Sequence, residues 1–163
     1  MGDTLYTRHV DVMEKMRKSE QEKRLWPWIE ICERTCIDAT GLGIGWADDA
    51  QDKFGENRVE AVTFTAQVKE ALAYGVKGDM EDRKMRIPED PHIRADFRKL
   101  QKVTTAAGNI RFVAEADTNG HADRFWAKAL ARQAASNPSA PIEFMSGGPR
   151  ERSSNFGDFV NGY

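Results

Sequence analysis

Short strand-like segments alternate with helix-like segments along most of this chain. The strands are expected at residues 4–13, 35–39, 59–64 and 86–87. Helices with an apolar stripe are expected after them, at about residues 19–32, 45–54, 66–80 and 90–100. Because strands joined through helices run parallel, this alternation predicts an α/β fold with a mainly parallel sheet that helices cover on both faces.

A hairpin and a last helix are expected after this alternation. The strand-like residues 103–105 and 110–114 flank the turn-forming sequence AAGN, which predicts a β-hairpin. An alanine-rich helix with Phe125 and Trp126 on its buried face is expected at about residues 120–135. The composition then shifts to Pro, Ser, Gly and Asn. We therefore expect one domain at residues 1–136 and a flexible or partner-binding tail at 137–163.

The composition excludes some classes of protein. A chain of 163 residues with 40% apolar residues is large enough for one domain with a core. Its net charge of −2 gives no overall basic field for nucleic acid, although 24 Lys and Arg can still cluster in space. No apolar stretch approaches the roughly 20 residues of a membrane span, and the N-terminus lacks a signal-peptide pattern. We expect a cytoplasmic protein without membrane contact.

The two cysteines, Cys32 and Cys36, have the spacing CxxxC. No second pair of cysteines or histidines accompanies them, as a structural zinc site would require. We therefore interpret them as two reduced, buried thiols rather than as a disulfide or a zinc site.

Two aspartates suggest a functional site. Asp38 ends the apolar run of an expected buried strand, and Asp123 lies in the first turn of the last helix. Ligand groups gather beyond the carboxyl ends of parallel strands, and carboxylates from a strand end and a helix start can converge on one metal ion. Asp123 is alternatively explained as a solvated carboxylate that is favoured by the helix dipole. Spacing alone favours this second interpretation over a joint catalytic role.

A nucleotide site is a weaker alternative. The sequence TGLGIGW follows a strand and opens a helix, as a dinucleotide-binding turn does. Its glycines have the spacing GxGxG rather than GxGxxG, and no acidic residue follows a clear second strand about 20 residues later. We therefore disfavour nucleotide binding.

Several motifs, in a characteristic order, carry a family resemblance. They are CIDATGLGIGWADDAQDKFG, RVEAVTFTAQVKEALAYGV, EDRKMRIPED, KVTTAAGNIRF and GHADRFWAKALA. Together they span most of the chain, which resembles the C-terminal, ribonuclease-H-like nuclease domain of Mu-like phage terminase large subunits. The resemblance implies a mixed sheet flanked by helices, and a role in phage DNA packaging.

The resemblance also implies a reaction and site residues. It implies two-metal endonucleolytic cleavage of concatemeric double-stranded DNA, with Mg²⁺ or Mn²⁺ held by oxygen ligands. Asp38 and Asp123 match the family's strand-end and helix acids and would hold the metal. His121 would touch a phosphate or the attacking water, or else would only cap the helix. These three residues are the expected catalytic set.

Three basic residues are expected to contact DNA. Lys69 lies in the segment VTFTAQVKEALA, where the resemblance implies contact with the DNA backbone. Lys102 and Arg111 lie on the expected hairpin and could grip phosphates. An ordinary solvated surface charge is the alternative for each of them.

The chain departs from the family pattern at its start. A ribonuclease-H-like sheet begins with three antiparallel strands, the first of which supplies another essential aspartate. These residues begin before what would be the third strand, so the first two strands, their aspartate and the ATPase domain are expected to be missing. No GxxxxGK[ST] phosphate loop occurs. We expect this chain alone to bind divalent metal weakly and to cut DNA poorly or not at all.

The expected absence of the first two strands bears on the partners and on the function of this chain. An open edge on the strand that contains Asp38 could pair with another polypeptide. The expected partners are double-stranded DNA, the phage portal, the small terminase subunit and an ATPase domain on the missing N-terminal part, all in the host cytoplasm. The alternative function is a non-catalytic module that binds DNA or the portal.

Overall fold

The computed structural model describes the chain apart from residues 1–3, 107, 109, 115–121 and 137–163. Five helices and six strands lie in the described part. The helices are α1 (Lys18–Ile31), α2 (Gly43–Phe54), α3 (Ala66–Glu81), α4 (Pro91–Lys99) and α5 (Asp123–Ser136). The strands are β1 (Leu5–Tyr6), β2 (Thr35–Asp38), β3 (Val59–Val62), β4 (Met85–Arg86), β5 (Leu100–Thr104) and β6 (Ile110–Ala114). The expected α/β class is confirmed.

In the described residues the strands form three separate pairs. Strands β1 and β4 pair in parallel, β2 and β3 pair in parallel, and β5 and β6 form the predicted antiparallel hairpin. Each pair has its own hydrogen bonds, so no continuous sheet joins them in this part of the chain. Strand β2 is therefore paired along one edge only.

The first strand is much shorter than the sequence predicts. Strand β1 has two residues, whereas the polar and apolar alternation suggested a strand over residues 4–13. Its partner β4 is equally short and pairs only with Leu5 and Tyr6; the Leu5 N–H donates to the Lys84 carbonyl and the Thr7 N–H to the Arg86 carbonyl. The alternation of polar and apolar residues continues after Tyr6, but β4 provides no further residues for pairing, so the strand ends there.

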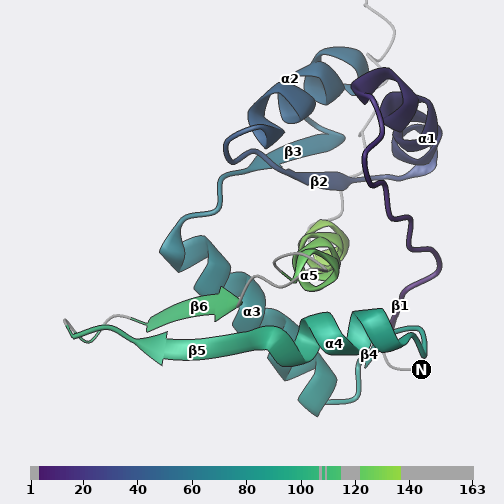
Figure 1. The fold of residues 1–163 in the computed structure, drawn as a ribbon. Helices are drawn as coiled ribbons and strands as arrows, with labels where there is room; N and C mark the ends of the chain where they lie inside the picture. Colours follow the sequence, from purple (N-terminus) through teal and green to yellow (C-terminus); the bar gives the residue numbers. More distant parts are fainter. Residues whose placement is uncertain (1–3, 107, 109, 115–121, 137–163) are drawn as a thin grey trace, which may run out of the picture.

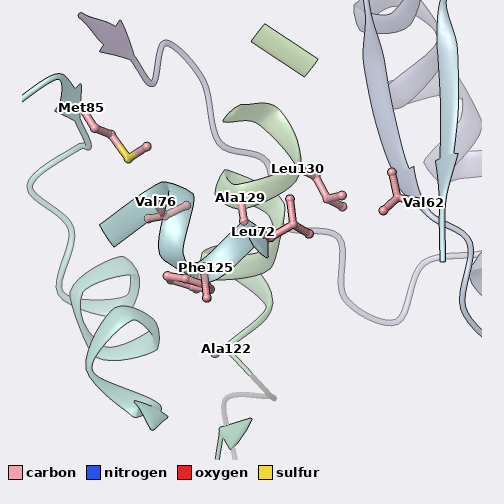
Figure 2. Packing of buried hydrophobic residues seen from close by; sticks show 9 residues of the cluster. Val62, Leu72, Val76, Met85, Ala122, Phe125, Ala129 and Leu130 are labelled. Atoms are coloured by element: carbon pink, nitrogen blue, oxygen red, sulfur yellow. The ribbon is translucent and has the colours of Figure 1, made fainter. Parts of the chain in front are cut away.

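Helix α5 lies at the centre of the molecule (Figure 1). The pair β2–β3 with α1 and α2 lies on one side of it, and α3, α4 and the hairpin lie on the other. Contacts to β2, α3 and α4 hold it there. Figure 2 shows the resulting core, in which Leu130 of α5 is directed toward Val62 of β3, and Phe125 lies beside α3. The main core of the described residues is thus built around one helix.

A smaller core holds the other side of the β2–β3 pair. Ile29 of α1, Ala50 of α2 and Val59 of β3 are buried together, and Trp26 and Phe54 pack against this group and edge to face against each other. None of the described helices is long and apolar enough to cross a membrane.

Candidate functional site

Asp38 is the last residue of β2, opposite Val62 of β3. Its Oδ1 accepts a hydrogen bond from the Thr40 N–H at 3.0 Å, so the carboxylate is held over the turn that follows the strand. The Thr40 hydroxyl in turn accepts from the Phe64 N–H at 2.9 Å, which ties this turn to the segment after β3. The half-buried Asp38 carboxylate therefore lies at the carboxyl end of both strands.

The backbone of Asp38 also meets the start of α2. A Cβ atom on Gly43, the first residue of that helix, would overlap the Asp38 carbonyl oxygen. Only glycine therefore fits there without a shift of the backbone. The glycine-rich turn thus serves close packing of α2 against the end of β2.

The first turns of helix α5 lie toward the carboxyl end of β3. Its Trp126 ring lies 5.4 Å from the Phe64 ring, just beyond the end of β3, whereas Gln133, two turns later, bonds to Glu60 within the strand. Asp123 is one turn before Trp126, exposed, and in the first turn of the helix. Asp38 thus ends β2, and Asp123 lies one turn of α5 before a residue that packs beside the end of β3.

Lys69 lies at this end as well. Its ammonium group is 5.4 Å from the centre of the Phe64 ring and 5.2 Å from that of Trp126. Cation–π contacts of this kind orient a lysine side chain without neutralising its charge. The half-buried Lys69 therefore presents a positive charge close to the helix that begins with Asp123.

The hairpin residues Lys102 and Arg111 point to opposite faces of β5–β6. Lys102 pairs with Phe112, and Val103 pairs with Arg111. Paired residues share a face and neighbours along a strand alternate, so the two basic side chains lie on opposite sides. The Lys102 ammonium lies 5.4 Å from the Tyr74 ring of α3. The two residues cannot grip one DNA strand from the same face of the hairpin.

The described residues contain no cluster of three or more His, Cys, Asp or Glu side chains that could hold a metal ion. Asp38 and Asp123 are two such groups, and His121 lies outside the described part of the chain. Carboxylate oxygens are nevertheless the ligands that Mg²⁺ prefers, and Mg²⁺ commonly uses only one or two of them together with waters and substrate phosphates. Each of the two carboxylates is therefore a suitable type of ligand for a hard divalent cation.

A groove opens beside Asp123. It has a volume of about 570 Å³ and lies between the N-terminal segment, α4 and the exposed face of α5. Asp123, Arg124 and Lys128 are among the residues that line it. Burial lowers the pKa of Lys128, although the charge of Asp79 opposes this shift. The groove is thus lined both by apolar side chains, such as Ile93 and Phe97 of α4, and by charged side chains of α5.

The cysteines occupy different environments. Cys32 is exposed, in contrast to the expectation that both thiols are buried, because it ends α1 at the surface. Cys36 is half-buried on β2, and its Sγ lies 3.4 Å from a carboxylate oxygen of Glu60. Burial, followed by the charge of Glu60, raises the pKa of Cys36 to about 12. Both thiols are free.

Sequence reasoning did not identify Asp96. This α4 residue is the one buried charged side chain in the described part of the chain, and its carboxylate contacts the first turn of α5. Its place on the buried stripe of α4, three residues after Ile93, was the signal that could have revealed it.

Comparison with known proteins gives consistent similarities. The model of a family described as the terminase RNaseH-like domain matches residues 1–134. The large terminase nuclease of the thermophilic phage G20c, solved with bound magnesium, is 26% identical, with a TM-score of 0.59 over 74% of this chain and 64% of that one. The same nuclease with bound cobalt is 25% identical over the same shares of the two chains, with a TM-score of 0.60.

A second nuclease shares the fold. The large terminase nuclease domain of Thermus phage P74-26 is 23% identical, with a TM-score of 0.57 over 79% of this chain and 64% of that one. This chain thus spans slightly less than two thirds of the length of these nucleases. No curated protein matches it.

Proposed function

We propose that this chain, which belongs to the terminase RNaseH-like domain family, is a DNA-cutting module of phage DNA packaging. The family membership confirms the predicted resemblance and ribonuclease-H-like fold. The observation that carries the proposal is the match of residues 1–134 to this family, and the position of Asp38 at the carboxyl end of the β2–β3 pair supports it. The proposed substrate is concatemeric double-stranded DNA.

Asp38 and Asp123 would hold the divalent cation, Mg²⁺ or Mn²⁺. The similar G20c nuclease was solved with magnesium and with cobalt, which supports a divalent cation in this family. When bound, the metal would lower the pKa of a water molecule and offset negative charge on the phosphate. Asp38 is held for this role by the Thr40 N–H, and Asp123 by its place in the first turn of α5.

Lys69 would contact the DNA backbone near these carboxylates. Its ammonium is held over two aromatic rings, and the ion pairs found in the described residues do not include it. A positive charge placed this way can attract a phosphate to the site. Lys102 and Arg111 face opposite sides of the hairpin, so we propose that each contacts a different DNA segment. His121 remains a proposed catalytic residue.

The proposal is tested by cleavage of supercoiled plasmid. The purified chain is incubated with Mg²⁺, Mn²⁺ or EDTA, beside Asp38→Ala, Asp123→Ala and the matched surface control Asp82→Ala. We expect slow, metal-dependent nicking by the wild type, because two carboxylates supply few protein ligands. Either site variant should lower the rate at least about 100-fold, and the control should not.

DNA binding is measured separately, by the change in fluorescence anisotropy of a labelled duplex. Catalytic carboxylates predict that binding persists in Asp38→Ala and Asp123→Ala while cleavage is lost. Lys69→Ala should weaken binding and reduce its dependence on salt. Metal-independent nicking, or nicking that survives both aspartate variants, would reject the proposal.

A second candidate function is a non-catalytic module that binds DNA or the portal. It is favoured by the absence of a three-ligand cluster among the described residues. This function predicts a folded chain that binds duplex DNA or portal protein but does not nick plasmid under any of the metal conditions. In either case we propose that the module acts in the host cytoplasm with the portal, the small terminase subunit and an ATPase domain.

A further inference from the structure

Asp96 is an acidic residue buried in the interior of the protein. It lies on α4 and is 1% exposed. Its Oδ2 accepts from the Arg124 N–H at 3.1 Å and from the Arg124 guanidinium at 3.3 Å. Its Oδ1 is 3.4 Å from the Lys99 ammonium. One carboxylate thus meets both the backbone and the side chain of the second residue of α5.

The start of α5 needs such a partner. The first N–H groups of a helix have no acceptor within the helix, and a side chain at the preceding position usually supplies one. Here the preceding residue is Ala122, which has no side-chain acceptor and is fully buried with a φ of 61°. Asp96 supplies the missing acceptor from another helix.

The interaction has a direct consequence for Asp123. Arg124 is its immediate neighbour, and Asp96 holds the Arg124 backbone and guanidinium together. The direction in which Asp123 leaves the helix depends on the conformation of this first turn. The bond from Asp96 therefore restricts where the Asp123 carboxylate can lie.

We propose that Asp96 is a positioning residue that orients the Asp123 carboxylate for divalent cation binding. This inference rests on the proposed function, because it assigns a purpose to the geometry of the same site. Asp96 does not itself touch the metal or the DNA in this proposal. It acts through Arg124 and the first turn of α5.

Charge contributes to the effect of Asp96. Its carboxylate lies between the cations of Arg124 and Lys99, in a place with little water. Removing one partner of a buried ion pair leaves the other charge uncompensated, so the turn is expected to rearrange. Asp96→Asn keeps the shape and one acceptor oxygen but loses the charge, which makes it the informative variant.

The experiment measures Mn²⁺ affinity by isothermal titration calorimetry and amide hydrogen exchange across α5, on the full chain. Asp96→Asn is compared with Asp82→Asn, a control that removes one negative charge from an exposed residue at the end of α3. We expect Asp96→Asn to weaken Mn²⁺ binding about 10-fold and to speed exchange in the first turn of α5. The control should change neither.

Folding is checked so that a structural loss is recognised. Asp96→Asn must unfold cooperatively in urea, and a saturating Mn²⁺ concentration should restore its plasmid nicking toward the wild-type rate. If saturating Mn²⁺ does not restore nicking by Asp96→Asn, the substitution has damaged the structure more generally. That result would overturn the positioning role of Asp96. Asp96→Ala, which lacks any acceptor, should show the same changes more strongly.

The Mn²⁺ titration distinguishes failure of the proposed function from failure of the positioning role alone. A wild-type chain that binds no Mn²⁺ would overturn the proposed function, and the positioning role with it. Wild-type binding that is equally tight in Asp96→Asn would overturn the positioning role alone and leave the proposed function standing.

Discussion

Glu60 on β3 holds three donors at once. Its carboxylate accepts from the Arg34 guanidinium and bonds with Cys36 and Gln133. Burial alone would raise the pKa of Glu60, but these hydrogen bonds and the charge of Arg34 together lower it below its usual value of 4.5. The residue joins β2, β3 and α5 through a single side chain.

The lowered pKa predicts a pH dependence of stability. A carboxyl with a depressed pKa in the folded state stabilises the fold above its unfolded pKa, and this contribution is lost as pH falls through the folded pKa. The difference in free energy of unfolding between wild type and Glu60→Gln should be constant above about pH 5 and should shrink below about pH 4.5. Urea unfolding at several pH values measures this. A difference that does not vary with pH would contradict the expectation.

The two thiols should differ in reactivity. The pKa of Cys36 is raised to about 12 by burial and by Glu60, so almost no thiolate exists at pH 8. Cys32 is exposed. Iodoacetamide should therefore modify one thiol per chain in the native protein and both in denaturant, as counted by mass spectrometry. Cys32→Ser, as the control, should leave the native chain almost unmodified.

Single residues were predictable where local sequence determines them. Asp38 at a strand end and Asp123 in a first helical turn follow from the pattern of their own segments. The orientation of Lys102 and Arg111 did not, because their faces depend on which residues pair across the hairpin. Asp96 was missed because its partner, Arg124, is 28 residues away.

At the scale of elements, the junction between β2 and α2 depends on Gly43. Any larger residue would place a Cβ against the Asp38 carbonyl oxygen. Gly43→Ala should therefore lower the free energy of unfolding by about 1–3 kcal/mol, because the backbone must shift to relieve the overlap. It should also displace Asp38. Urea denaturation measures the first effect and Mn²⁺ titration the second.

Gly45 provides the matched control. It lies two residues later in α2, and a Cβ there would meet nothing within 4 Å. Alanine is a better helix former than glycine, so Gly45→Ala should leave stability unchanged or raise it by up to about 1 kcal/mol. Equal effects of the two substitutions would show that close packing at Gly43 is unimportant.

The elements were predicted better than their lengths. The hairpin and the helices occur in the expected order, with modest shifts at their ends. The first strand ends much earlier than its alternating pattern suggested, because regular strand structure requires a partner and β4 offers only two positions. A pattern in one segment does not reveal the length of the strand beside it.

At the scale of the whole molecule, Phe125 connects three helices. Its ring meets Phe97 of α4 at 5.0 Å, and its side chain is buried in the core that includes Leu72 and Val76 of α3. Phe125→Ala should lower the free energy of unfolding by about 3–5 kcal/mol, since it removes a buried ring and leaves a cavity. Chemical denaturation monitored by circular dichroism measures this loss.

Val113 is the control for this substitution. It is 41% exposed on β6, so Val113→Ala should cost well under 1 kcal/mol beside Phe125→Ala. A comparable loss from both would mean that the core around α5 is not the main source of stability.

The sequence by itself determined the class of fold, the order of the elements and the positions of the two aspartates at a strand end and a helix start. These features depend on periodicity and on residues close together in the chain. Only the tertiary structure decided that Trp126 of α5 packs on Phe64 beyond the end of β3, that Lys69 rests on both rings, and that Asp96 caps α5. Those contacts join distant segments, and they form only when burial of apolar side chains packs the segments together.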